Sequence, residues 1–319
     1  MADSLANGLA VRARTVAAPA APARARRPRS RSRSRSRLVP LLYTAPALLF
    51  YLAFVIAPWL HSLWISFWDW NGIGVATWAG LGNYRETVSD PALRLSLIHA
   101  FGLIVFYSVI PICLGLVLAA LVANMPWKGM PFVRTVIFLP QILPLVAVGS
   151  VWKLFFDDDG PLNSVLRTVG LDNATRAWLG DFTWAYPAVG VVGTWVSTGL
   201  CFLLLYSGIG KIDPTLYEAA RLDGAGAVHE FRHVTVPGLR RELSVAATVT
   251  VIAALASFDV VYVMTGGGPG EATMVPGVAI YRLTFTAGQV GTACALATVL
   301  SVLTCAVMYV LNRLTREKP

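Results

Sequence analysis

Charged residues are scarce in this chain of 319 residues: they make up 13% of it, while hydrophobic residues make up 56%. A soluble domain carries about 25% charged residues. No Lys, Arg, Asp or Glu occurs in the stretches 38–68, 95–127, 135–152, 182–210 and 283–312, and 243–270 contains a single one, Asp259. About 20 apolar residues cross the ~30 Å hydrocarbon core of a membrane as a helix. The shortage of charge argues against a large soluble helical protein, because six such stretches leave too little polar surface to cover them.

Cysteine and histidine are also few, with four of each. All four cysteines fall inside apolar stretches and none has C-x-x-C spacing, which argues against a disulfide framework. His229 and His233 are four residues apart, but no Cys or carboxylate stands at ligand spacing to complete a metal site. The nucleotide-binding pattern G-x-x-x-x-G-K-S/T is absent, since the glycine clusters at 224–226 and 266–268 lack the lysine. We therefore expect no metal, no cofactor and no ATP site in this chain.

The apolar stretches predict an all-α integral membrane protein with six transmembrane helices and both termini in the cytoplasm. The predicted spans are about 41–66, 96–123, 135–156, 187–208, 243–264 and 290–312. With the N-terminus inside, 20 of the 26 Lys and Arg residues lie on the cytoplasmic side, as the positive-inside rule requires. Pro140 and Pro144 should kink the third span, because proline removes a helical hydrogen bond.

The first 37 residues differ from the rest and end in an alternating Arg-Ser run, 29–37. Such a segment cannot bury enough apolar surface to fold, so we predict a disordered cytoplasmic tail. Its basic charge suits contact with anionic membrane lipid and helps to set the topology. An alternating Arg-Ser run could also bind RNA. We expect no nucleic-acid partner, because the tail runs straight into a span at Leu38.

The inner loop 209–241 is the longest polar stretch between spans on the cytoplasmic side. Asp213 is a good N-cap and Pro214 suits the first helical position, which together predict a helix over 214–223. Gly224 should end it, and a second short helix is predicted over 227–234. The two short helices and their connection, residues 214–234, form a compact unit that we call the knob. It either presents a small apolar face to another protein or simply connects two spans.

Several residues of the predicted helix 214–223 could make contacts with a partner. Its small apolar side chains and the charged ones at their edge are Leu216, Ala219, Ala220, Leu222, Glu218, Arg221 and Asp223. Glu218-Ala219-Ala220, followed after three residues by Gly224 and after nine more by 234–237 (Val-Thr-Val-Pro), resembles the EAA motif of ABC importer permeases. The segments 81–84, 138–141 and 258–269 resemble the sugar-permease branch of that family. The resemblance covers about 40–315, nearly everything but the tail.

Membership of this family would imply a type I ABC importer permease fold in the inner (plasma) membrane of a prokaryote. The resemblance implies three protein partners: a second permease that completes the pore, cytoplasmic ATP-binding subunits, and an extracytoplasmic solute-binding protein. It also implies that the chain is not an enzyme, and that a partner hydrolyses ATP. The residues implied to couple the permease to the ATPase are Glu218, Ala219, Ala220, Arg221, Asp223 and Gly224.

Candidates for the substrate pathway come from polar and aromatic residues in the predicted spans. Asp259 is the main one, since an intramembrane carboxylate usually faces a cavity or a partner; it could instead form a hydrogen bond to the neighbouring permease. The further candidates are Tyr262, Gln141, Trp152 and Trp195. The resemblance points to a sugar or oligosaccharide as cargo, with glycerol phosphate as an alternative. An ion-coupled secondary transporter is the competing class, but it would need more intramembrane charges.

Overall fold

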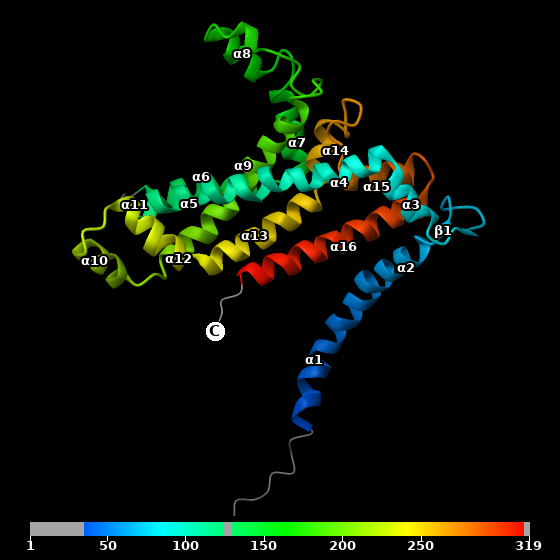
Figure 1. Ribbon diagram of the computed structural model, residues 1–319, viewed down its shortest axis with the longest axis horizontal. Helices are drawn as coiled ribbons and strands as arrows, with labels where there is room; N and C mark the ends of the chain where they lie inside the picture. The colour runs from blue at the N-terminus through cyan, green and yellow to red at the C-terminus, as the bar shows by residue number, and fades with distance from the viewer. Residues whose placement is uncertain (1–34, 124–128, 316–319) are drawn as a thin grey trace, which may run out of the picture. The chain divides into compact units, whose positions relative to one another are not determined.

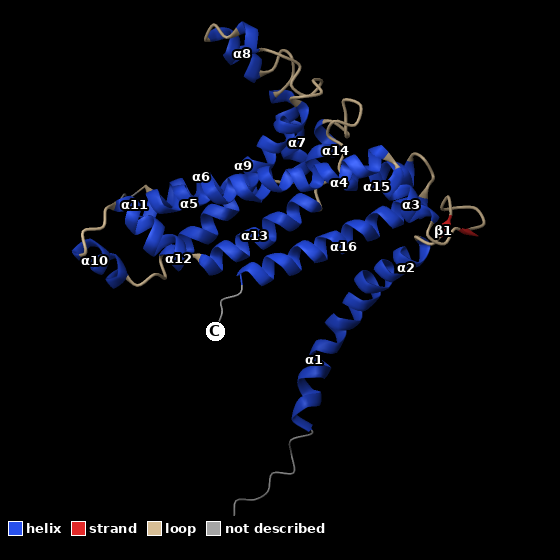
Figure 2. Cartoon of the chain, viewed as in Figure 1, coloured by secondary structure: helices blue, strands red, loops and turns tan. Residues whose placement is uncertain are grey.

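The computed structural model describes residues 35–123 and 129–315, and almost all of its secondary structure is helical (Figure 2). The chain divides into two compact units, Met1–Ile56 and Ala57–Pro319. In the first unit, α1 (Arg35–Tyr51) continues into a π-helical turn, η1 (Leu52–Ile56). Phe50 and Phe54 stack there with ring centroids 5.8 Å apart. The predicted tail lies outside the described residues except for its last three positions.

The second unit is a bundle of long helices joined by short ones (Figure 1). Its elements are α2 (Ala57–Ile65), β1 (Trp68–Asp69), β2 (Thr77–Trp78), α3 (Gly82–Ser89), α4 (Pro91–Ile104), η2 (Val105–Val109), α5 (Ile110–Ala123), α6 (Met130–Ile142), α7 (Leu145–Phe155), α8 (Pro161–Thr168), η3 (Asp172–Ala174), α9 (Ala185–Ile209), α10 (Pro214–Leu222), α11 (Ala227–Glu230), η4 (Phe231–Thr235), α12 (Val236–Gly238), α13 (Arg240–Leu255), α14 (Asp259–Met264), α15 (Pro276–Phe285) and α16 (Val290–Thr315). The two strands form a short antiparallel pair in which Trp68 faces Trp78.

Four helices in the described part of the chain are long and apolar enough to cross a membrane. They are Tyr43–Ile65, Pro91–Ala123, Ala185–Ile209 and Val290–Thr315, and a fifth span results if α6 and α7 count as one. The predicted span 243–264 does not appear as a single helix, so the count of six remains a prediction. The location of the termini in the cytoplasm also remains a prediction.

The predicted third span, 135–156, is broken more sharply than a kink. α6 and α7 meet at an angle of 97°. Leu143, the residue before Pro144, has extended dihedrals of φ −72° and ψ 140°, as sterics at a pre-proline residue favour. Pro140 lies inside α6 without ending it. The predicted bend is therefore present at Pro144 but is larger than a kink, and α7 leaves the direction of α6 to pack against α14.

The predicted fifth span, 243–264, is also divided. α13 ends at Leu255, and α14 begins at Asp259 after three residues that are not helical. Two of those residues pack closely on α15: a Cβ on Gly277 would lie 2.9 Å from the Ser257 carbonyl oxygen and 3.1 Å from the Phe258 Cβ. The segment 265–289, between the predicted fifth and sixth spans, contains α15, which begins at Pro276 in the favoured first helical position.

Close helix packing centres on α9, which contacts α5, α6, α13 and α14. A Cβ on Gly115 of α5 would lie 2.7 Å from the backbone nitrogen of Phe202, and one on Gly199 of α9 would lie 2.6 Å from the Ile137 carbonyl oxygen. Small residues at such crossings let backbones approach closely, as is usual between helices in membranes. This packing fixes the half of the bundle next to α10 around the buried Phe202 and Leu205.

The segment 81–84 lies where the C-terminal end of α2, the helix α3 and the N-terminal end of α16 meet. Asn83 is 6% exposed and donates hydrogen bonds of 2.9 Å to the carbonyl oxygens of Ser66 and Trp68. Tyr84 and Ser66 share a hydrogen bond of 2.5 Å between their hydroxyls. Thr292 of α16 donates to Glu86 of α3 at 2.9 Å. These bonds satisfy buried polar groups and tie α2, α3 and α16 together.

Candidate functional site

The helix α10 has the caps that its sequence predicts. The Asp213 carboxylate accepts a hydrogen bond of 2.9 Å from the Thr215 backbone N–H, and this bond lowers the pKa of Asp213 below its ordinary value. At the other end, the N–H groups of Gly224 and Ala225 donate to the carbonyl oxygens of Arg221 and Ala220 at 3.0 and 2.9 Å. This is a Schellman motif, and Gly224 supplies its left-handed residue with φ +81°.

Two side-chain contacts hold α10 against the helical segment 227–238. Arg221 donates to both carboxylate oxygens of Glu230, at 2.8 and 3.2 Å. The Glu230 carboxylate raises the pKa of the Arg221 guanidinium. The Tyr217 hydroxyl is 3.0 Å from the Thr235 hydroxyl. Arg221, predicted to contact a partner, thus already has a partner inside the loop and serves to brace it.

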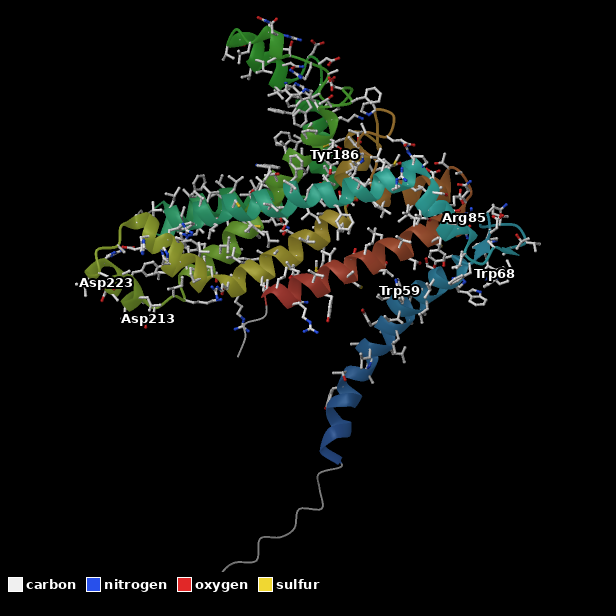
Figure 3. The ribbon with its side chains drawn as sticks, in the orientation of Figure 1. Trp59, Trp68, Arg85, Tyr186, Asp213 and Asp223 are labelled. Carbon is white, nitrogen blue, oxygen red and sulfur yellow. The ribbon has the colours of Figure 1, made fainter. Side chains whose placement is uncertain are left out.

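The outer surface of this knob is uncovered. Leu222 is 89% exposed and Val228 is 81% exposed, and Glu218, Ala219, Asp223 and Gly224 are exposed as well. Asp213 and Asp223 mark the two ends of α10 in Figure 3, at the opposite end of the Ala57–Pro319 unit from Trp68. Large apolar side chains left in water beside charged ones are typical of a surface that another protein covers.

A cleft of about 240 Å³ separates α10 from the C-terminal ends of α5 and α9. Glu218 and Arg221 line it from α10, and Ala123 and Ile209 line it from the bundle. The charged edge of α10 therefore faces this cleft, while Leu222 stays uncovered. α10 is held mainly by its contacts with 227–238, because none of its own residues is buried.

A second cavity, of about 290 Å³, lies inside the bundle where the two broken spans meet. Its lining residues come from η2, α6, α7, α9, α13 and α14, and they include the ends of both breaks: Tyr107, Gln141, Leu143, Leu145, Val196, Ser197, Leu200, Val249, Thr250, Ala253, Ala256, Ser257, Phe258, Asp259 and Val260. Irregular backbone at membrane depth is tolerated where it lines a cavity. The cavity thus collects Gln141 and Asp259, two of the predicted pathway residues.

Tyr107 is the residue of this cavity that sequence reasoning missed. It lies on the π-helical turn η2, a local insertion that often marks functional positions. Its ring packs directly on Gly193 of α9, where a Cβ would collide with the ring. Its hydroxyl lies close enough to Ser257 and Asp259 to interact with both, but no hydrogen bond of ordinary geometry to a described residue satisfies it although Tyr107 is only 8% exposed. A buried hydroxyl without a partner is costly, so a ligand or water is expected to satisfy it.

A family match extends over the knob and over every lining residue of the cavity except Tyr107. The model of the binding-protein-dependent transport system inner membrane component matches residues 111–317. That range runs from α5 through α16, which is more than half of the chain. The chain belongs to this permease family.

Individual relatives agree with the family match. A probable ABC transporter permease, YurN of Bacillus subtilis, is 38% identical over 277 residues, which is 85% of this chain and 93% of the relative. The lactose transport system permease LacF of Rhizobium radiobacter is 32% identical, covering 76% and 82% of the two chains. A crystal structure of a bacterial ABC transporter that imports the acidic polysaccharide alginate has the same fold, with a TM-score of 0.76, 20% identity, and coverage of 88% of this chain and 96% of that one.

The remaining pathway candidates of this permease lie outside the lining of the cavity. Trp152 and Trp195 contact each other edge-on, with ring centroids 5.6 Å apart, and Trp152 also packs against Phe155 and Phe156. Tyr262 stacks on Phe258 at 5.1 Å and meets Tyr281 at 4.9 Å. Trp195 and Tyr262 are nevertheless 41% and 40% exposed, so the place of these three aromatic residues in the substrate pathway remains a prediction.

Proposed function

We propose that this permease is one half of the pore of an ATP-driven importer for a sugar or oligosaccharide. An extracytoplasmic solute-binding protein delivers the cargo, a second permease completes the pathway, and cytoplasmic subunits hydrolyse ATP. Family membership supports the transport role, and the sugar named for a relative, lactose, supports the cargo class. The observation that carries the proposal is the cavity at the two helix breaks, where a carboxylate, an amide and an unpartnered hydroxyl converge.

The loop 209–241 couples the permease to the ATPase in this proposal. The exposed face around Ala219, Leu222 and Gly224 docks on the ATP-binding subunit. Hydrogen bonds hold the two parts of the knob together, so that it moves as one body. They join Arg221 to Glu230 and Tyr217 to Thr235. Both termini lie in the cytoplasm, on the same side as this loop.

Movement of the knob reaches the cavity through α13. This helix begins at Arg240, directly after the knob, and ends at Leu255, beside the cavity. Its 16 residues span about 24 Å at 1.5 Å per residue. A stiff helix of that length transmits a displacement of the loop to the break at 256–258, which carries Ser257 and leads into Asp259. The cavity then changes shape as the ATPase dimer closes.

Sugar binding to the assembled transporter tests the proposal. Asp259→Ala removes an acceptor that faces the cavity and should weaken binding at least tenfold, as expected for a lost hydrogen bond to a charged group. Asp158→Ala is the matched control, because it removes a carboxylate that lies outside the lining, and it should bind as the wild type does. An unchanged affinity in Asp259→Ala would remove that residue from the site.

A further inference from the structure

The only charged side chain among the described lining residues of the cavity is the carboxylate of Asp259. Its polar lining side chains are Tyr107, Gln141, Ser197, Thr250, Ser257 and Asp259. None of the described lining residues is Lys, Arg or His. The cavity of this permease therefore holds one carboxylate and no cation of its own.

The Asp259 carboxylate is free to act on a ligand. The ion pairs among the described residues involve Arg167, Lys211 and Arg221, and none reaches Asp259. No hydrogen bond within the described ranges satisfies its oxygens either, and the Gln141 amide is in the same position. A carboxylate only accepts hydrogen bonds, so what enters the cavity must bring donors or positive charge.

We infer that the cavity selects an uncharged or amine-bearing sugar and rejects uronic, sulfonated or phosphorylated sugars, with Asp259 as the residue that determines this specificity. The inference rests on the proposed function and names its substrate class. The fold alone does not decide the matter, because the structural relative with a TM-score of 0.76 imports an acidic polysaccharide. Two like charges about 5 Å apart at an effective dielectric constant of about 20 repel each other enough to weaken binding on the order of a hundredfold. Opposite charges at that distance attract by a similar factor.

Binding to the complete transporter, purified with its partner subunits and measured without the solute-binding protein, tests the inference. The probes are disaccharides of matched size built from glucose, glucosamine or glucuronate. The wild type should bind the glucose and glucosamine forms and bind the glucuronate form on the order of a hundredfold more weakly. Asp259→Asn should bring the glucose and glucuronate forms within about threefold of each other and remove any preference for the amine, because the repelling charge is gone.

Two further variants keep the inference falsifiable if Asp259→Asn fails to assemble. Gln141→Glu adds a second carboxylate to the same cavity and should weaken the glucuronate form by about a further tenfold or more. Asp158→Asn, outside this cavity, should leave the ratio between sugars unchanged. Equal binding of glucose and glucuronate forms by the wild type would overturn the inference, and so would full discrimination retained in Asp259→Asn. If no sugar of any charge bound or stimulated ATP hydrolysis, the proposed function would fail instead.

Discussion

Substitutions at Gly224 can distinguish effects on the conformation of the loop from effects on its contact with a partner. Its backbone is left-handed, with φ +81°, and no atom of a described residue lies within 4 Å of a Cβ placed there. Gly226, two residues further on, has equally empty surroundings but an ordinary φ of −80°. Gly224→Ala places a Cβ in the left-handed region, at a cost of about 1–2 kcal/mol to the loop. Gly226→Ala should instead stabilise the loop by about 0.4–1 kcal/mol, since its conformation suits alanine.

The effect of side-chain size at position 224 on coupling then shows whether a partner surface lies against the loop there. Asparagine tolerates the left-handed region, so Gly224→Asn should keep the loop folded with a small loss of coupling. The Cβ of a tryptophan at 224 has no described atom within 4 Å, so we attribute any loss beyond that of Gly224→Ala to the surface that docks on the loop. The assay is the number of sugar molecules transported per ATP hydrolysed in proteoliposomes of the complete transporter. We expect the Gly224→Trp transporter to hydrolyse ATP but to transport less than about a tenth as much sugar per ATP as the wild type. A tenfold loss corresponds to about 1.4 kcal/mol of lost docking free energy. A fully coupled Gly224→Trp transporter would refute the reasoning.

Three further predictions concern the helix cap and the cavity. Asp213→Ala should speed amide hydrogen exchange in α10 by removing the cap, whereas Asp213→Asn, which keeps an accepting oxygen, should change it little. The pKa of Asp213 is lower in the folded loop than its ordinary value of 3.8, so the cap stabilises α10 fully above that value and loses its effect as the pH falls through the lowered pKa; Asp213→Asn should show no such pH dependence in hydrogen exchange. Gly193→Ala should push the Tyr107 ring out of place, destabilise the permease by about 1–3 kcal/mol and weaken sugar binding, while Gly210→Ala, whose Cβ meets nothing closer than 3.7 Å, should leave both melting temperature and binding unchanged.

Local signals were enough to predict the knob. Asp213, Pro214 and Gly224 act through hydrogen bonds and dihedrals within a few residues, and the structure has α10 with the expected cap and the expected left-handed glycine. The charge-free stretches likewise predicted a helical membrane fold, because membrane thickness sets the length of an apolar helix. The role of Arg221 was not visible, since its partner Glu230 lies on the next helix.

The helix breaks and the position of Tyr107 depend on packing between residues far apart in the sequence, and local patterns therefore did not reveal them. The break between α13 and α14 contains no proline or glycine, and it forms where Ser257 packs against Gly277, twenty residues away. Pro144 signalled a bend in the third span, but not its angle of 97°. Tyr107 faces the cavity because of a π-helical turn and the space above Gly193, and neither has a signature in the local pattern. Asp259 and Gln141 were found because a polar group is conspicuous in an apolar span.

The most direct test of the account is whether the loop 209–241 touches the ATP-binding subunit. A photo-crosslinking amino acid at Ala219, which is exposed on α10, would be activated in membranes that contain the complete transporter. The control is the same group at Val169, the residue that follows α8, whose exposed fraction is 63%. In the proposed topology this residue lies on the extracytoplasmic side of the membrane. The account predicts an adduct with the ATP-binding subunit from position 219 and none from 169. Adducts with that subunit from 169 but not from 219 would contradict both the coupling role and the orientation.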